Sequence, residues 1–412
     1  MSTFVTLLGE AKDRYVTDVI QSLSCKAGFV EANKLTPDAT KLLAKPLFAI
    51  AADILRLNGH AADEYGDREL LAEQAMAMGS IGKRTVSFSE NEHPVFATAT
   101  GGPATRPADF PTILSGLANK IIDTIELDED YSYSEISALH QTGLRDFKPS
   151  LMANRSVVEE MDELSDGEQF KELGLSEEML SYLFLRRFGN KFGWTPAMIA
   201  NDDMDSFSEG MIGLRQAWEV TQNRLVLEPL VGNATLLDGS ELFSNRPNIG
   251  TALNNNARTG GGAPSDSEWG AMQNLFADIS GINTAKRVRG ELNVCLVPTG
   301  AYYQEARRTF DTLVESKSAS TTAELGLYRG RVKIVPESEL REASGTTWYG
   351  FRNPTNKQNA TLIRAYFSGY GTKGRRESWY DSETKCLYVS LEGRIAVAIK
   401  NWRYVVRNVT GS

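Results

Sequence analysis

Residues 206–229 read SFSEGMIGLRQAWEVTQNRLVLEP, and this stretch carries the clearest helix signal in the chain. Ser206 and Glu209 have the spacing of a capping box, in which each side chain accepts a hydrogen bond from the other residue's backbone N–H. Since proline disfavours a helix interior, the pattern predicts one helix from Ser206 to about Glu228, roughly 33 Å long. Its apolar residues fall on a single helical face, and they are Phe207, Met211, Leu214, Trp218 and Leu225.

The segment before this helix is long and acidic. Between Val157 and Glu178 stand nine acidic residues and one basic residue, Lys171, so the segment carries a net charge of −8. The acidic residues are Glu159, Glu160, Asp162, Glu163, Asp166, Glu168, Glu172, Glu177 and Glu178. Residues 150–194 are therefore expected to form a long polar segment outside the core, with a strand at 182–187.

The end of the chain has the opposite charge. Residues 362–412 contain nine basic and four acidic residues, a net charge of +5. A charge asymmetry of this kind suggests that one part of the chain docks on another part, or on another copy.

The first ninety residues are expected to be helical. Thr36 is a suitable N-cap, and Pro37 then occupies the first helical position. An apolar stripe that includes Phe48, Ile54 and Leu55 needs a surface to cover it, and we expect another subunit to supply that surface. From Ser87 to Pro111 the chain is rich in Gly, Pro, Thr and Ala, which predicts a loop or an extended arm.

The remainder mixes helix and strand signals without a regular βαβ repeat, so the predicted fold class is α+β. Helices are expected at 110–125, 267–279 and 301–314. Strands are expected at 293–297, 332–335, 347–351, 362–367, 387–391 and 395–406.

Composition excludes several classes of protein. The chain has 412 residues, of which 41% are hydrophobic and 24% charged, so disorder over its whole length is excluded. It contains no run of about 18 apolar residues, the length that a membrane-spanning helix needs. The N-terminus lacks the basic region of a signal peptide, so we expect no secretion by that route. Three scattered cysteines argue against a disulfide framework and against a zinc site.

No catalytic, cofactor-binding or metal-binding residue is predicted. His140 is the best general base, but a lone histidine in an apolar helical stretch is usually a packed residue. The run Gly369–Arg376 lacks the spacing of a phosphate-binding loop and reads as a turn. Asn201-Asp202-Asp203 reads as the lead into the cap of the long helix rather than as a metal site. Basic residues alternate with aromatic ones near the C-terminus, a pattern that can bind nucleic acid, but those stretches also look like strands.

Seven short blocks, in chain order, resemble blocks of Mu-like prophage major head subunits. They are DFPTIL (109–114) with ANK (118–120), LRDFKP (144–149), IANDD (199–203), DGSELF (238–243) with Asn248, LVP (296–298), TWY (347–349), and AI (398–399) with Trp402, Arg403 and Asn408. The resemblance covers residues 109–408. The chain departs from the family pattern beside Pro247, where a histidine is missing, and over residues 392–401.

This resemblance implies the tailed-phage major capsid fold (HK-ninety-seven-like). The implied function is that of a major capsid protein, whose hexamers and pentamers form an icosahedral shell around double-stranded DNA. The implied location is the virion capsid, assembled in the host cytoplasm. The partners would be other copies of the chain and packaged DNA, with decoration, portal and scaffold proteins as further candidates, and no membrane. The alternative readings are a capsid-associated maturation protease and another DNA-binding virion protein.

The resemblance also suggests how the chain is divided. The expected parts are a helical N-terminal extension (1–90), an N-arm with the start of the peripheral domain (91–149), an extended acidic loop (150–196), a spine helix of the peripheral domain (197–234), an axial domain (235–360) and return strands of the peripheral domain (361–412).

In the resembled fold the extended loop lies over the peripheral domain of a neighbouring subunit. We therefore expect the acidic loop to dock between subunits on the basic C-terminal region. The loop would contribute Glu159, Glu160, Asp162, Glu163, Asp166, Glu168 and Glu172. The basic partner residues would be Arg364, Lys373, Arg375, Arg376, Arg394 and Lys400.

Overall fold

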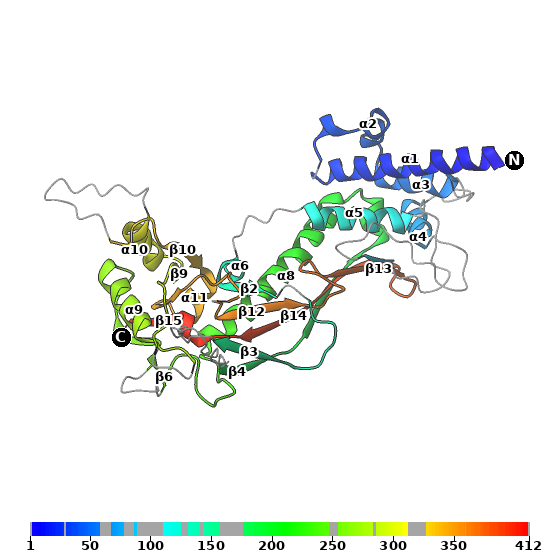
Figure 1. The fold of residues 1–412 in the computed structure, drawn as a ribbon. Helices are drawn as coiled ribbons and strands as arrows, with labels where there is room; N and C mark the ends of the chain where they lie inside the picture. Colours follow the sequence, from blue (N-terminus) through cyan, green and yellow to red (C-terminus); the bar gives the residue numbers. More distant parts are fainter. Residues whose placement is uncertain are drawn as a thin grey trace, which may run out of the picture. The chain divides into compact units, whose positions relative to one another are not determined.

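The computed structural model describes residues 2–28, 30–57, 67–77, 86–88, 110–124, 131–140, 143–156, 176–246, 254–282, 286–311, 327–358 and 360–410. The chain forms two compact units. Unit 1 comprises residues 1–129, 187–219 and 369–394, and unit 2 comprises residues 130–186, 220–368 and 395–412. Helix α8 (Met204–Val231) and strand β14 (Cys386–Ile399) contribute residues to both units (Figure 1). Within the described residues, no helix has the length and apolar character needed to cross a membrane.

Unit 1 begins with a group of helices, as expected. They are α1 (Ser2–Lys26), the short 3-10 helix η1 (Ala32–Lys34), α2 (Pro37–Leu43), α3 (Leu47–Leu57), α4 (Arg68–Ala77) and α5 (Phe110–Thr124). The predicted start signal is confirmed, because Thr36 caps α2 by accepting a hydrogen bond from the Ala39 N–H at 3.1 Å. Helix α1 contacts α2 and α5, and α4 contacts α3 and α5.

The apolar stripe of α3 is already covered within the chain. Ile54 and Leu55 are each only 1% exposed, and α3 contacts both α4 and the short helix α7 (Pro196–Ala200). The expectation that another subunit buries this stripe is therefore wrong. Helices distant in the sequence supply the covering surface, which a reading of the stripe alone cannot show.

Strands complete unit 1. Strand β1 (Val86–Phe88) pairs antiparallel with β13 (Arg375–Asp381), and β13 pairs antiparallel with residues 386–392 of β14. Strand β5 (Arg186–Trp194) also pairs with β14. Apart from Val86–Phe88, the expected arm at 87–111 lies outside the described residues, up to the start of α5.

The long helix is confirmed, but its ends differ from the prediction. Its cap is Asp203 rather than Ser206, because the Asp203 carboxylate accepts hydrogen bonds from the Ser206 N–H at 3.1 Å and from the Ser206 Oγ at 2.7 Å. The helix also continues through Pro229 to Val231. Proline removes one hydrogen bond to the carbonyl four residues earlier, but here the helix runs two residues past it. The five apolar residues of the predicted face are all buried.

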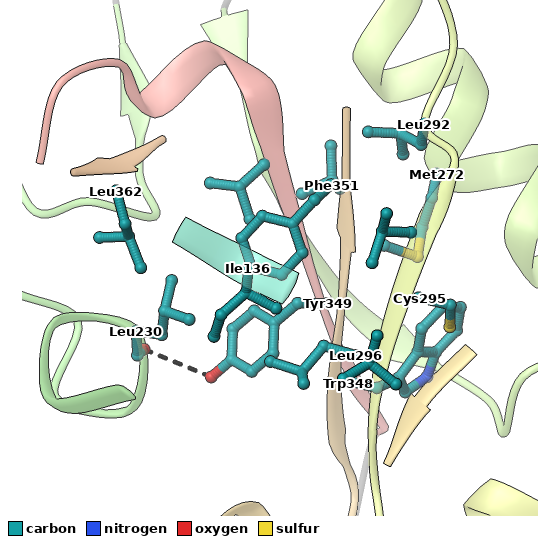
Figure 2. Close-up of a cluster of buried hydrophobic side chains, with 14 of the residues drawn as sticks. Ile136, Leu230, Met272, Leu292, Cys295, Leu296, Trp348, Tyr349, Phe351 and Leu362 are labelled. Atoms are coloured by element: carbon teal, nitrogen blue, oxygen red, sulfur yellow. Dashed lines mark hydrogen bonds between the residues drawn. The ribbon is translucent and has the colours of Figure 1, made fainter. Parts of the chain in front are cut away.

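Unit 2 is built on a five-stranded sheet. Its strands lie in the order β10 (Lys333–Glu337), β9 (Val294–Pro298), β11 (Thr347–Phe351), β15 (Val405–Thr410) and β8 (Ala257–Gly261). Helices α9 (Asp266–Asp278), α10 (Ala301–Phe310) and α11 (Ser338–Ala343) accompany this sheet. Figure 2 shows the core beside β11, where the Tyr349 hydroxyl donates to the Leu230 carbonyl oxygen at 3.3 Å.

Unit 2 also contains a second group of paired strands and a separate two-stranded hairpin. Residues 395–399 of β14 pair with β12 (Leu362–Tyr366), which pairs in parallel with β2 (Ser137–Leu139) after the short helix α6 (Tyr133–Ile136). The hairpin consists of β3 (Ser150–Ser156) and β4 (Ser176–Leu183). The remaining short elements are β6 (Asn245–Arg246), β7 (Asn254–Asn255) and the 3-10 helix η3 (Trp402–Tyr404).

Three local predictions are wrong. The strand expected at 182–187 is the end of β4, a two-residue connection and the start of β5. The strands expected at 387–391 and 395–406 form the continuous β14, followed by η3 and the start of β15. His140 follows strand β2 instead of lying in a helix. Gly393 lies within β14, and the strand continues through it. Its missing side chain leaves room for the Trp218 ring.

Candidate functional site

The acidic candidates occupy the connection of the β3–β4 hairpin. The two strands pair from Ser150 opposite Leu183 to Ser156 opposite Ser176. Residues 157–175 join the strands and lie outside the described residues. This part of the chain contains all seven acidic candidates, which are Glu159, Glu160, Asp162, Glu163, Asp166, Glu168 and Glu172.

Four of the six basic candidates belong to unit 1. Lys373 and Arg376 meet at one carboxylate, that of Asp123 on α5, at 3.7 Å and 2.8 Å. Arg376 also donates to the Asn119 carbonyl oxygen at 3.1 Å and is only 3% exposed. Its guanidinium therefore fastens β13 to α5, a role within one subunit.

The other two, Arg364 and Lys400, belong to unit 2 and also bind their own chain. Arg364 donates to the Tyr133 carbonyl oxygen at 2.9 Å, and its guanidinium lies over the Tyr133 ring. Lys400 Nζ donates to the Lys357 carbonyl oxygen, and burial lowers the pKa of Lys400. Both side chains therefore stabilise contacts within their own chain. Their positive charge in the sequence does not by itself indicate this role.

Arginines gather around Tyr370 in unit 1. Arg394 and Arg375 both approach the Tyr370 ring, with guanidinium carbons 4.6 Å and 5.7 Å from its centre. Glu392 binds Arg394 and Arg187 through its two carboxylate oxygens, each at 2.7 Å. Arg375 also binds Glu377 at 2.8 Å. We call Arg187, Arg375 and Arg394 the arginine cluster.

Arg187 was missed in the sequence because it lies nearly two hundred residues before its partners in the cluster. Its side chain is 71% exposed, whereas that of Arg394 is 18% exposed. Glu392 raises the pKa of Arg187 through a hydrogen bond and its negative charge. Arg187 is therefore the most accessible member of the arginine cluster, whose guanidinium groups pair with Glu392 and Glu377.

A buried ionic network holds the base of the hairpin. Glu178 on β4 binds the guanidinium of Arg403, which also donates to the Ser280 carbonyl oxygen at 3.0 Å. Arg403 and Arg246 each lie 4.5 Å from the ring centre of Trp402, so one indole contacts two cations. Asp238 binds Arg246 at 2.8 Å. In the sequence, Glu178 is only one of nine acidic residues between Val157 and Glu178.

Strand β4 and the connection that follows it carry exposed apolar side chains. Met179, Tyr182 and Phe184 are each about half exposed. Tyr182 and Phe184 line a hollow of about 420 Å³ together with Leu225, Pro229, Ile395 and Val397. Exposed apolar surface of this kind often marks a contact with another protein. The continuous apolar run at 182–185 is a signal that could indicate such a surface.

A polar node joins three segments inside unit 2. The Glu337 carboxylate accepts hydrogen bonds from the Ser132 hydroxyl and, at 3.0 Å, from the Asn223 amide of α8. Asn223 in turn accepts a hydrogen bond from the Tyr133 N–H at 3.1 Å. Glu339 lies beside this node, and burial together with the charge of Glu337 raises the pKa of Glu339.

Replacing Glu339 with glutamine should raise the melting temperature at pH 7. The raised pKa means that the folded chain binds this proton more tightly than the unfolded chain, so the carboxylate destabilises the fold above that pKa. The gain should shrink as the pH falls through the pKa of Glu339, because the wild-type carboxylate then becomes protonated and loses its charge. Thermal unfolding of the wild type and the variant at pH 7 and pH 4 checks this. A gain that is equal at both values would contradict it.

The structure assigns structural roles to the motifs considered for catalysis or metal binding. Asp203 caps α8, and the run Gly369–Arg376 forms a turn with positive φ at Gly371 and Gly374 before entering β13. Among the described residues, no group of three His, Cys, Asp or Glu residues is placed to hold a metal ion.

Comparison with known proteins gives one family match. The sequence model of a family described as phage capsid protein matches residues 181–408, whereas no curated protein matches the chain. Similar solved structures include the capsid of Myoviridae phage XM1, with 10% identity, a TM-score of 0.41, and coverage of 69% of this chain and 94% of that one. They also include the capsid of Ralstonia phage GP4, with 11% identity, a TM-score of 0.42, and coverage of 69% and 92%.

Proposed function

This chain belongs to the phage capsid protein family, and we propose that, as the major capsid protein of a tailed phage or prophage, it assembles into an icosahedral shell of hexamers and pentamers. The single observation that carries this is the family match, which spans 181–408 and therefore more than half of the chain. The family indicates a structural role. The proposed partners are other copies of the chain, and the packaged cargo would be double-stranded DNA.

We also propose how the chain is divided. On this proposal the β3–β4 hairpin with the acidic residues between its strands forms the extended loop (150–196), and α8 forms the spine helix (197–234). We infer that β8, β9, β10, β11 and the helices beside them belong to an axial domain (235–360). Strands β12, β13 and β14 would form the return strands of the peripheral domain (361–412), which the N-arm region (91–149) begins, whereas β15 (Val405–Thr410) completes the five-stranded sheet.

Size-exclusion chromatography with light scattering tests the assembly of the purified chain. A shell protein should elute with the mass of capsomers or larger particles, well above the 45.4 kDa of one chain. A compact monomer or dimer that stays so at high concentration would instead favour the alternative readings, a maturation protease or another DNA-binding virion protein.

We further propose that the acidic loop of one copy docks on basic residues of another. Among the basic candidates, Lys373 and Arg375 support this role because their side chains are 36% and 35% exposed, whereas that of Arg394 is only 18% exposed. The arginine cluster adds Arg187, which is 71% exposed. Arg364, Arg376 and Lys400 are occupied within their own units, so we assign them to the fold. Exposed pairs are worth roughly 0–1 kcal/mol each, so several must act together.

Reversing Lys373 and Arg375 to glutamate should impair assembly far more than folding, because both side chains are partly exposed. The double variant places two negative charges where the acidic loop would bind, so particles should become scarce at low salt. High salt should also weaken wild-type assembly, because it screens exposed pairs. Sedimentation of the variant at low and high salt measures the effect.

The matched control reverses Lys34 and Lys41, two exposed lysines of unit 1, and makes the same change in charge. It should assemble like the wild type. Normal assembly of the Lys373/Arg375 variant at low salt would show that the acidic loop does not dock there. Arg376 is left unchanged, because its loss would disturb folding.

A further inference from the structure

Helix α7 ends in an arrangement that normally favours glycine. The Asp203 N–H donates to the Met198 carbonyl oxygen at 2.9 Å, and the Asp202 N–H donates to the Ile199 carbonyl oxygen at 3.2 Å. These two hydrogen bonds define a Schellman motif, in which the residue after the C-cap adopts a left-handed conformation. Asp202 occupies that position with φ of 57°. Asparagine and aspartate tolerate this conformation better than other non-glycine residues, but glycine adopts it without steric cost.

The Asp202 carboxylate makes a distant contact that glycine could not make. Its Oδ1 accepts a hydrogen bond from the Leu47 N–H at 2.8 Å, across 155 residues of sequence. Leu47 is the first residue of α3, and Pro46 before it has no side-chain acceptor with which to cap the helix. Asp202 therefore supplies the cap that the sequence around α3 lacks.

The second carboxylate oxygen reaches a different helix. Asp202 Oδ2 lies 3.4 Å from Nζ of Lys26, the last residue of α1. The same ammonium donates to the Lys45 carbonyl oxygen at 2.5 Å, immediately before Pro46. One carboxylate thus joins the end of α1, the start of α3 and the junction between α7 and α8. Next to it, Asp203 caps α8, so two successive aspartates serve two different helices.

We propose that Asp202 is a positioning residue that fixes the N-terminal helices α1 and α3 to the α7–α8 junction of unit 1. The left-handed backbone aims its carboxylate at Leu47 and Lys26, which gives a physical reason for an aspartate where glycine would be less strained. On this account the helices before residue 78 are held to the rest of unit 1 by a specific cap, in addition to apolar packing. The inference concerns one subunit and does not depend on assembly.

Hydrogen–deuterium exchange of the full-length chain separates the cap from the backbone conformation. Asp202→Asn keeps an oxygen acceptor and tolerates positive φ, Asp202→Gly keeps the φ but loses the acceptor, and Asp202→Ala loses both. Amides in the first turn of α3 should exchange roughly five- to tenfold faster in the glycine and alanine variants, the effect of losing one cap. The asparagine variant should remain close to the wild type.

Asp203→Ala is the matched control, because it removes the neighbouring cap. It should speed exchange in the first turn of α8 and leave α3 protected, whereas Asp202→Gly should do the reverse. Wild-type exchange at the start of α3 in a folded glycine variant would overturn the proposal. So would a loss of protection at α3 in Asp203→Ala equal to that in Asp202→Gly. Circular dichroism of each variant establishes that it is folded.

Discussion

Replacing Glu178 with alanine lowers the free energy of unfolding by about 3 kcal/mol on this account. The change leaves the Arg403 guanidinium, whose side chain is 8% exposed, without its carboxylate partner. Arg246, a second cation, lies on the same Trp402 indole. Burial lowers the pKa of Arg246, and the negative charge of Asp238 opposes that lowering. The figure is at the low end for a broken buried pair because Glu178 itself retains some contact with water. Urea denaturation followed by tryptophan fluorescence measures it.

Two further variants test whether charge or packing matters at this position. Glu178→Gln keeps hydrogen-bond acceptors but loses the charge, so it should fall between the wild type and alanine. Glu177→Ala changes the exposed neighbour on the same strand and should alter stability by about 0.5 kcal/mol or less. Equal stability of the Glu177 and Glu178 alanine variants would show that the pair with Arg403 contributes little.

Replacing Gly393 with alanine should lower the free energy of unfolding by about 1–3 kcal/mol, the usual range for overpacking. A Cβ at this position would lie 2.2 Å from the Trp218 ring. The indole cannot easily turn aside, because its Nε1 donates to the Thr372 carbonyl oxygen at 2.7 Å. The added methyl group must therefore displace the strand, the helix or that hydrogen bond.

Gly213→Ala is the matched control, since it lies on the same helix as Trp218. A Cβ there would meet nothing within 4 Å, and alanine favours a helix over glycine by up to about 1 kcal/mol. This variant should therefore be as stable as the wild type or more stable. A Gly393 variant that shared this behaviour would contradict the close approach of Trp218 to β14. Urea denaturation of both variants gives the comparison.

Local signals in the sequence predicted the elements whose determinants are also local. Thr36 and Pro37 start a helix because their contacts lie within one turn of it. The apolar face of α8 was readable since its period fits a helix, and strand β11 was predicted with its observed ends. Pro229 misled the prediction, because α8 continues past it to Val231 although proline removes the hydrogen bond to the carbonyl four residues earlier.

The features that decide the candidate site depend on partners far away in the sequence. Glu178 binds Arg403 across 225 residues, and Asp202 caps a helix that begins 155 residues earlier. A single sequence gives the charge of each residue but not its neighbours. For that reason the basic candidates Arg364, Arg376 and Lys400 could not be separated from the exposed ones, and Arg187 was overlooked. The docking of the acidic residues in 157–175 stays a prediction.

Electron microscopy of the purified full-length chain in negative stain tests whether the chain forms a shell. We expect closed shells, or capsomers with sixfold and fivefold outlines, that form from this chain without other proteins. Fields that contain only small compact particles, at concentrations and salt conditions where the chain is folded, would contradict a role as the shell-forming capsid protein.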